Sequence, residues 1–142
     1  MRKLKQTITV MLCILMVLSL TLPAHAANAR LSHGVIASCG FDVGSSGWAE
    51  VYVTYSGNAT SFTNIRVETY IQKRTLGFIW TKVDNGEPDK TWVDTSTENG
   101  GIFDHGLQLD STGTYRAVFT VTFSGTGAAD DVIEDKIERT YG

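Results

Sequence analysis

The sequence predicts an all-β sandwich as its fold class, and three observations support this prediction. Short runs that alternate apolar and polar side chains recur along the chain, and this is the period of a strand with one buried face. Turn-forming Gly, Ser, Thr and Asn residues separate these runs about every eight to twelve residues, which is typical of sandwiches and barrels. Downstream of Pro23 the only proline is Pro88, so almost every run can pair within a sheet.

The first 26 residues have the three parts of a secretory signal peptide. Three basic residues precede an apolar segment at 8–22, and two Ala-x-Ala triplets follow it. Fifteen apolar residues are fewer than the roughly 20 that span a bilayer, so we expect no stable membrane span after cleavage. We expect cleavage after Ala26, with Ala29 as the alternative site, and one exported domain at 27–142.

Cleavage after Ala26 would leave an acidic domain with a single cysteine. It would remove three of the 12 basic residues and none of the 15 acidic ones, which leaves a net charge of −6. Such a charge argues against nucleic acid or an anionic membrane as a partner. Cys13 would be lost, and the apolar setting of Cys39, "VIASCGF", favours burial over pairing between chains.

The first half of the exported domain predicts three strands. Residues 35–41 form the first, and the turn residues at 42–47 end it. Alternation at 48–55 gives a second strand, with these residues on its core face: Ala49, Val51, Val53 and Tyr55. The run at 62–73 gives a third, whose core face holds Ile65, Val67 and Ile71.

The second half predicts about four more strands. Residues 77–83 form a short strand that ends at the turn "DNGEPD", and the next begins at "TWVDT". We expect the Gly-Gly pair at 100–101 to break the chain before a strand whose shared parity contains Phe103, His105, Leu107 and Leu109. The strand at 115–123 is the most regular, with a core face of Tyr115, Ala117, Phe119, Val121 and Phe123.

The last segment, residues 128–141, suits two structures. A strand is favoured because the run at 115–123 would otherwise lack a partner on one edge. The spacing of Ile133, Ile137 and Tyr141 suits an amphipathic helix, which is the alternative.

The stretch "LDSTGTY", residues 109–115, resembles the tyrosine corner of immunoglobulin-like sandwiches. In that motif a Tyr at the start of the penultimate strand returns its hydroxyl to the backbone a few residues upstream. Asp110 and Gly113 would shape the turn, and Tyr115 would tie it. Ala117 stands where antibody domains carry a Cys, so the resemblance implies an immunoglobulin-like sandwich of about seven antiparallel strands without that disulfide.

Three segments are similar to small secreted proteins of Gram-positive bacteria. They are "IRVETYIQK" at 65–73, "GFIWTKV" at 77–83 and "GTYRAVFTVTFSGTG" at 113–127. The resemblance implies an exported immunoglobulin-like fold, and it brings no activity and no site residues.

Motifs for catalysis or metal binding are weak. The sequence contains no Gly-x-Ser-x-Gly elbow, and the remaining nucleophile and base pair is Cys39 with His105. "DNGEPD" at 84–89 gathers oxygen atoms but lacks the length and the closing Glu of an EF-hand loop. We therefore expect no enzyme, no metal site and no cofactor, and a small hydrolase is the least favoured alternative.

Aromatic side chains are the main candidates for a binding site. Parity directs three of them away from the core, and two more lie in strands of unassigned facing: Trp48, Tyr52 and Tyr70, then Trp80 and Trp92. Outward aromatics can stack on a sugar or contact a protein, unless a loop or the second sheet covers them. We expect a secreted, non-catalytic binding module for an extracellular protein or glycan. The alternative is a structural or envelope-associated protein without a defined ligand.

Overall fold

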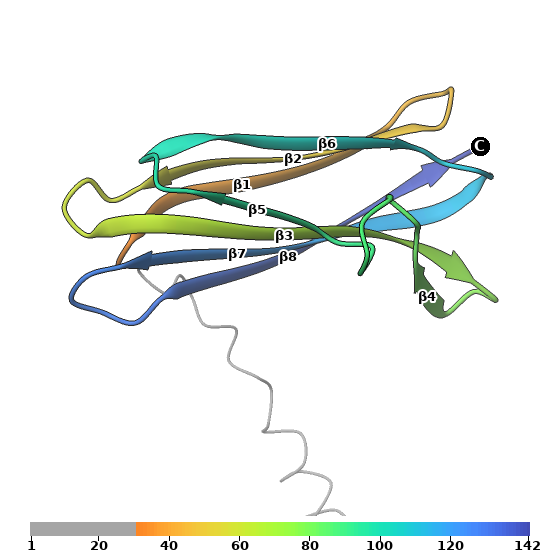
Figure 1. Ribbon diagram of the computed structural model, residues 1–142. Coiled ribbons are helices and arrows are strands. Elements are labelled where there is room, and N and C mark those ends of the chain that lie inside the picture. Colours follow the sequence, from red (N-terminus) through yellow and green to blue (C-terminus); the bar gives the residue numbers. More distant parts are fainter. Residues whose placement is uncertain (1–30) are drawn as a thin grey trace, which may run out of the picture. The chain divides into compact units, whose positions relative to one another are not determined.

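The computed structural model describes residues 31–142. The predicted signal peptide at 1–26 lies outside the described residues. Every regular element at 31–142 is a strand, and eight strands form where about seven were expected (Figure 1). Their bounds are β1 (Gly34–Val43), β2 (Trp48–Gly57), β3 (Phe62–Thr75), β4 (Ile79–Lys82), β5 (Trp92–Ser96), β6 (Gly100–Gln108), β7 (Gly113–Gly125) and β8 (Asp131–Tyr141).

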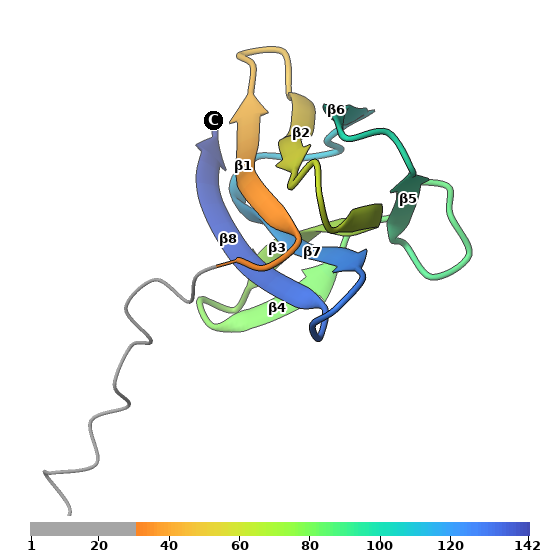
Figure 2. The same ribbon diagram turned by 90° about the vertical axis from the view of Figure 1, so that its left-hand side faces the viewer.

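The strands form two antiparallel sheets, which Figure 2 shows nearly end-on. One sheet has three strands in the order β1-β2-β6, and the other has five, in the order β4-β3-β7-β8 with β5 also paired to β3. With 14 residues, β3 is long enough to pair on one edge with both short strands. It meets β5 along Ile65–Thr69 and β4 along Gln72–Thr75.

A hydrophobic core lies between the two sheets, and it contains the alternating residues that the sequence predicts. In β2 and β3 each predicted inward residue is buried, and its neighbours along the strand are more exposed. In β7 the five residues from Tyr115 to Phe123 at odd positions are buried too. Val118 faces the other side of β7 and is nevertheless buried, next to Tyr70 and Lys136 in the register.

The tyrosine corner is confirmed. The Tyr115 hydroxyl donates a hydrogen bond of 2.5 Å to the carbonyl oxygen of Ser111, four residues upstream. The side chain is 2% exposed, so this hydroxyl has exchanged water for a backbone partner. The bond ties the turn between β6 and β7 to the start of β7.

One edge of the sandwich is closed by Asp131, the first residue of β8. Its carboxylate accepts three successive backbone N–H groups at the entrance to β1: Ser32 at 2.9 Å, His33 at 2.6 Å and Gly34 at 3.0 Å. The His33 ring is fully buried and occupies the space that a Cβ at Gly125 would need. These contacts join the first and last strands, which belong to different sheets.

Two expectations about the second half are resolved. The segment at 128–141 forms a strand, since β8 pairs with β7 from Asp131 to Tyr141. The predicted break at Gly100–Gly101 is wrong: both residues lie in β6 and pair with Ser56 and Tyr55. At Gly101 a Cβ would lie 3.2 Å from the Tyr55 hydroxyl oxygen, a tight contact, whereas at Gly100 it would make only ordinary contacts. The break falls instead before Gly100, between β5 and β6.

Candidate functional site

The five aromatic residues singled out from the sequence lie in three separate places. Trp48 and Tyr52 project from β2 on the outer face of the three-stranded sheet, where they are 50% and 36% exposed. Tyr70 and Trp80 lie half-buried on β3 and β4 of the five-stranded sheet. Trp92, only 7% exposed, belongs to the core. The structure therefore places two of the five residues on one sheet, two on the other and the fifth in the core.

Trp48 and Tyr52 lie over glycines of the neighbouring strands. The Trp48 ring occupies the space above Gly106 of β6, and the Tyr52 ring that above Gly40 of β1, so a Cβ at either glycine would overlap the aromatic ring. A glycine inside a strand often marks such a close approach. The rings therefore rest on the neighbouring strands, and each leaves its other side toward solvent. We call Trp48 and Tyr52 the β2 aromatic pair.

Carboxylates surround the β2 aromatic pair. Asp42 of β1 stands directly opposite Glu50 of β2, and Asp104 of β6 stands opposite Tyr52. Like charges directly opposite each other destabilise a sheet. The guanidinium Nε of Arg139 is 3.9 Å from a carboxylate oxygen of Asp42, a long contact between exposed groups. This face thus combines two aromatic rings with three hydrogen-bond acceptors.

The rings of Tyr70 and Trp80 are engaged by cations. The Lys82 ammonium lies 4.3 Å from the Tyr70 ring centroid. The guanidinium carbon of Arg116 is 4.1 Å, and that of Arg74 5.7 Å, from the Trp80 centroid. Arg116 also donates from Nε to Oε1 of Gln72 at 2.7 Å. A ligand that stacks on these rings would have to displace the cations.

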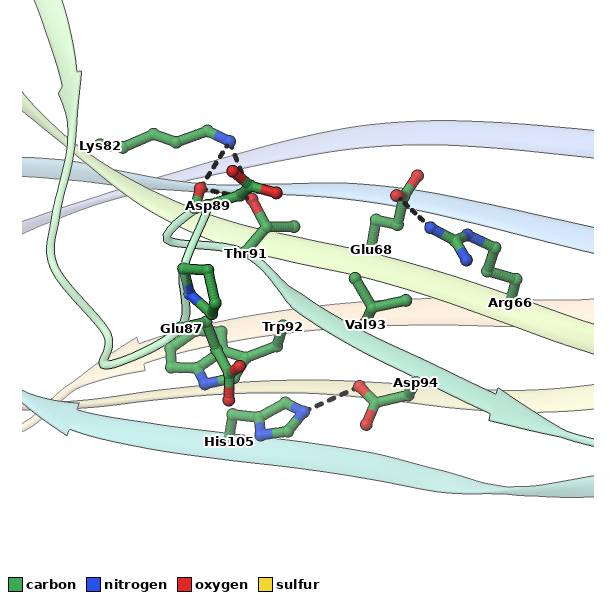
Figure 3. Close-up of a pocket in the computed structure, with 11 residues that line it drawn as sticks. Arg66, Glu68, Lys82, Glu87, Asp89, Thr91, Trp92, Val93, Asp94 and His105 are labelled. Atoms are coloured by element: carbon green, nitrogen blue, oxygen red, sulfur yellow. Dashed lines mark hydrogen bonds and ion pairs between the residues drawn. The ribbon is translucent and has the colours of Figure 1, made fainter.

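A hollow of about 780 Å³ lies at the other edge of the sandwich (Figure 3). The side chains that line it come from β3, β5, β6, the end of β4 and the loop that precedes β5. Its charges pair mainly with one another: Arg66 lies 2.7 Å from Glu68, and the Lys82 ammonium donates to the Thr91 hydroxyl at 2.8 Å. The volume suits a small ligand, but a ligand would compete with contacts already made.

His105 and Asp94 cross the same hollow from one sheet to the other. Nε2 of His105 lies 2.8 Å from a carboxylate oxygen of Asp94, and the imidazole stacks on Trp92 with centroids 4.9 Å apart. His105 is on β6 and Asp94 on β5, so the pair joins the edge strands of the two sheets. A histidine oriented by a carboxylate is also the base of nucleophilic triads. Such a role requires a nucleophile within hydrogen-bond distance of His105.

The Cys39 thiol lies far from His105. Cys39 pairs with Val53 and His105 with Val51, so β2 separates them. Because neighbouring strands lie about 4.8 Å apart, the two residues are about 10 Å or more from each other. Burial, and to a smaller extent the Asp135 carboxylate, raises the pKa of the half-buried Cys39 thiol to about 11. The thiol is therefore protonated at neutral pH, as its apolar sequence setting indicated.

The oxygen-rich turn at 84–89 is held by its own side chains. The carboxylate of Asp84 accepts from the Gly86 N–H at 3.0 Å, and the amide oxygen of Asn85 accepts from the Glu87 N–H at 3.1 Å. Gly86 has a positive φ of 86°, which the turn requires. Within residues 31–142 no three His, Cys, Asp or Glu side chains are arranged to hold a metal ion.

Comparison with protein-family models, curated proteins and solved structures finds no match for this chain. In the part of the chain that the structure describes, no helix is long and apolar enough to cross a membrane.

Sequence reasoning missed two features that shape the candidate site. It did not assign a role to Gly40 and Gly106, although glycines inside otherwise regular strands were a visible signal. It also missed that Arg74 and Arg116 stand beside Trp80, since Arg74 faces it only through the register of the β3–β4 hairpin and Arg116 comes from β7, a distant strand. The exposure of each aromatic residue depends on these neighbours.

Proposed function

We propose that this protein is a secreted, non-catalytic binding module with an immunoglobulin-like architecture, and that its ligand is an extracellular glycan. The strand order supports the architecture, because the first, second and sixth strands share one sheet while the third, seventh and eighth share the other. The tyrosine corner at Tyr115 and the similarity to secreted proteins of Gram-positive bacteria agree with it. The signal-like first 26 residues support export.

The exposure of the β2 aromatic pair carries the functional proposal. Trp48 is the most exposed of the three tryptophans, and folding has not covered it. A sandwich of this size has room to bury its large aromatics, as it does with Trp92. An exposed Trp and Tyr on one strand face therefore favour a contact with another molecule.

A glycan fits this face better than a protein surface does. The faces of aromatic rings are electron-rich and pack against the C–H groups of a sugar ring, while carboxylates accept hydrogen bonds from its hydroxyls. Glu50 and Asp104 stand beside the rings and supply these acceptors. A protein patch would instead be expected to exclude charged groups from its centre. An extracellular protein is the second candidate ligand.

The other two function classes have less support. Exposed aromatic rings and two carboxylates directly opposite each other do not stabilise the fold. A protein without a ligand offers no explanation for this face. A hydrolase needs a nucleophile or a water site next to His105, and the Cys39 thiol is on the far strand of the same sheet.

Tryptophan fluorescence during titration with cell-wall and plant glycan fragments tests the proposal. We expect at least one glycan to shift the emission of the protein, because Trp48 would move from water into a contact. Tyr52→Ala keeps Trp48 as the reporter and should weaken binding about tenfold, through the loss of one stacking surface. Trp80→Phe is the matched control and should bind as well as the unaltered protein. If no glycan changes the emission, the glycan proposal fails.

A further inference from the structure

The turn between β3 and β4 exposes three apolar side chains. Leu76 is 80% exposed, Phe78 76% and Ile79 42%. In Figure 1 this turn projects at the end of the molecule opposite to the β2–β3 and β7–β8 turns. Burial of apolar side chains drives folding in the rest of the domain, so folding does not explain why three of them are exposed together in this turn. We call Leu76, Gly77, Phe78 and Ile79 the hairpin tip.

The backbone of the hairpin tip makes the exposed leucine more unusual. Leu76 has a φ of 50° and Gly77 a φ of 81°, and the Phe78 N–H donates to the Thr75 carbonyl at 3.2 Å. Positive φ values at both central residues of a β-turn are characteristic of type I′, where Asn or Asp followed by Gly is preferred, and here the turn lies in a loop of three residues between the paired Thr75 and Ile79. Leucine adopts this region rarely. The sequence therefore keeps an apolar side chain where the turn itself favours a polar one.

Cations stand directly behind the hairpin tip. Residues 69–83 contain Lys73, Arg74 and Lys82 and no Asp or Glu, although the chain as a whole is acidic. Arg116 joins them from β7 and stacks with Arg74 on Trp80. Carboxylates also face these cations: Asp84 and Asp110 line a hollow with Lys73 and Lys82, and Glu138 pairs in register with Arg116. An apolar tip is thus followed by the Trp80 ring together with Arg74, and then by the remaining cations.

We propose that the hairpin tip inserts into the headgroup and outer acyl region of an anionic membrane. Apolar side chains enter the acyl boundary, tryptophan prefers the interface, and Lys and Arg are attracted to anionic headgroups. From the turn inward, Leu76 and Phe78 come first, Trp80 follows with Arg74 opposite it in the register, and Lys73, Lys82 and Arg116 lie further along the strands. The acidic net charge opposes membrane binding by the rest of the domain, so contact is confined to the tip. The tip is convex, which suits a lipid surface that deforms around it.

Sedimentation with lipid vesicles tests this proposal. The full chain is mixed with vesicles of phosphatidylcholine alone, or of phosphatidylcholine with phosphatidylglycerol, at several salt concentrations. We expect binding to the anionic vesicles that falls as salt rises. The double variant Leu76→Asn, Phe78→Ser should bind at least about tenfold less, because it removes the inserted side chains. Asn suits the positive φ at position 76, so the hairpin should keep its fold.

The double variant Val93→Ser, Val132→Ser is the matched control. It removes two other exposed apolar residues, 48% and 59% exposed, from the five-stranded sheet. It carries the same N-terminal residues as the tip variant, and we expect it to bind anionic vesicles as the unaltered chain does. The proposal is overturned if the unaltered chain does not sediment with anionic vesicles, or if the tip variant binds as well as this control.

Quenching by brominated acyl chains gives a second readout at the hairpin. In a Trp48→Phe background the remaining tryptophans are Trp80, beside the tip, and Trp92, in the core. We expect bromine in the acyl chains to quench the emission, and the Leu76→Asn, Phe78→Ser change to remove the quenching. Emission that bromine leaves unchanged would contradict insertion. Tip-dependent capture by a soluble protein in place of vesicles would also overturn the membrane proposal.

Discussion

Tyr115 combines three roles in one side chain. Its ring packs in the core near the start of β7, and its hydroxyl donates a hydrogen bond of 2.5 Å to the Ser111 carbonyl oxygen. The Lys73 ammonium lies 5.5 Å from the centroid of the same ring. Since the hydroxyl is buried, removing it would leave the carbonyl without this partner. A single polar atom thus determines how the turn between β6 and β7 meets the sheet.

Tyr115→Phe should destabilise the protein by roughly 1 to 3 kcal/mol, because a buried hydrogen bond is lost while the ring volume is kept. The free energy of unfolding, measured by urea titration, checks this value. Tyr52→Phe is the control, since its ring is exposed, and it should change stability by less than about 0.5 kcal/mol. An unchanged midpoint for Tyr115→Phe would show that the hydroxyl bond does not support the turn.

At the scale of elements, the alternation of apolar and polar residues predicted the core faces of the strands. It did not predict features that depend on a neighbouring strand. The core faces of β2, β3 and β7 followed from the sequence, because period-two patterns report one buried face. The Gly-Gly pair at 100–101 was assigned to a break because glycine usually marks turns, whereas both residues pair with β2 and Gly101 lies close to the Tyr55 side chain. The helical spacing in β8 arises because only every second inward residue there is strongly apolar, which places the apolar residues four apart, and pairing with β7 decides the structure.

The Asp131 clamp joins β8 to the entrance of β1, and Asp131→Asn should weaken it. Asn keeps one acceptor oxygen in place of two and carries no charge, so we expect a loss of about 2 kcal/mol of stability. Thermal unfolding followed by circular dichroism measures this loss. Asp130→Asn changes the adjacent exposed carboxylate and should have little effect. Equal midpoints for the two variants would contradict the clamp.

The same clamp predicts part of the acid sensitivity. Partial burial raises the Asp131 pKa, but the backbone N–H groups of Ser32, Gly34 and His33 and the nearby His33 ring outweigh this, so the pKa lies below 3.8. A carboxyl with a lowered folded pKa stabilises the protein above its unfolded pKa, and this contribution is lost as the pH falls through the folded value. Asp131→Asn should therefore flatten the fall in stability below about pH 4. An unaltered pH profile would show that Asp131 does not contribute.

For the whole molecule, parity along a strand predicted on which face a side chain lies. It did not predict what covers that face. Trp48 and Trp92 both lie at the start of a strand, yet one is exposed over Gly106 and the other stacks on His105 in the core. Which sheet a strand joins, and which strand lies next to it, depends on contacts between residues far apart in the sequence. The sequence therefore predicted the aromatic residues of the candidate site. It did not predict that they are divided between the two sheets and the core.

The indole signals of the three tryptophans report whether the ligand binds at the β2 aromatic pair. In a ¹⁵N NMR titration with a glycan that binds, we expect shifts for the Trp48 indole and for the backbone amides of Gly40 and Gly106. The Trp92 indole, buried against His105, should remain in place. Shifts centred on Trp80 or Trp92, with Trp48 unchanged, would contradict the assignment of the ligand to the β2 aromatic pair.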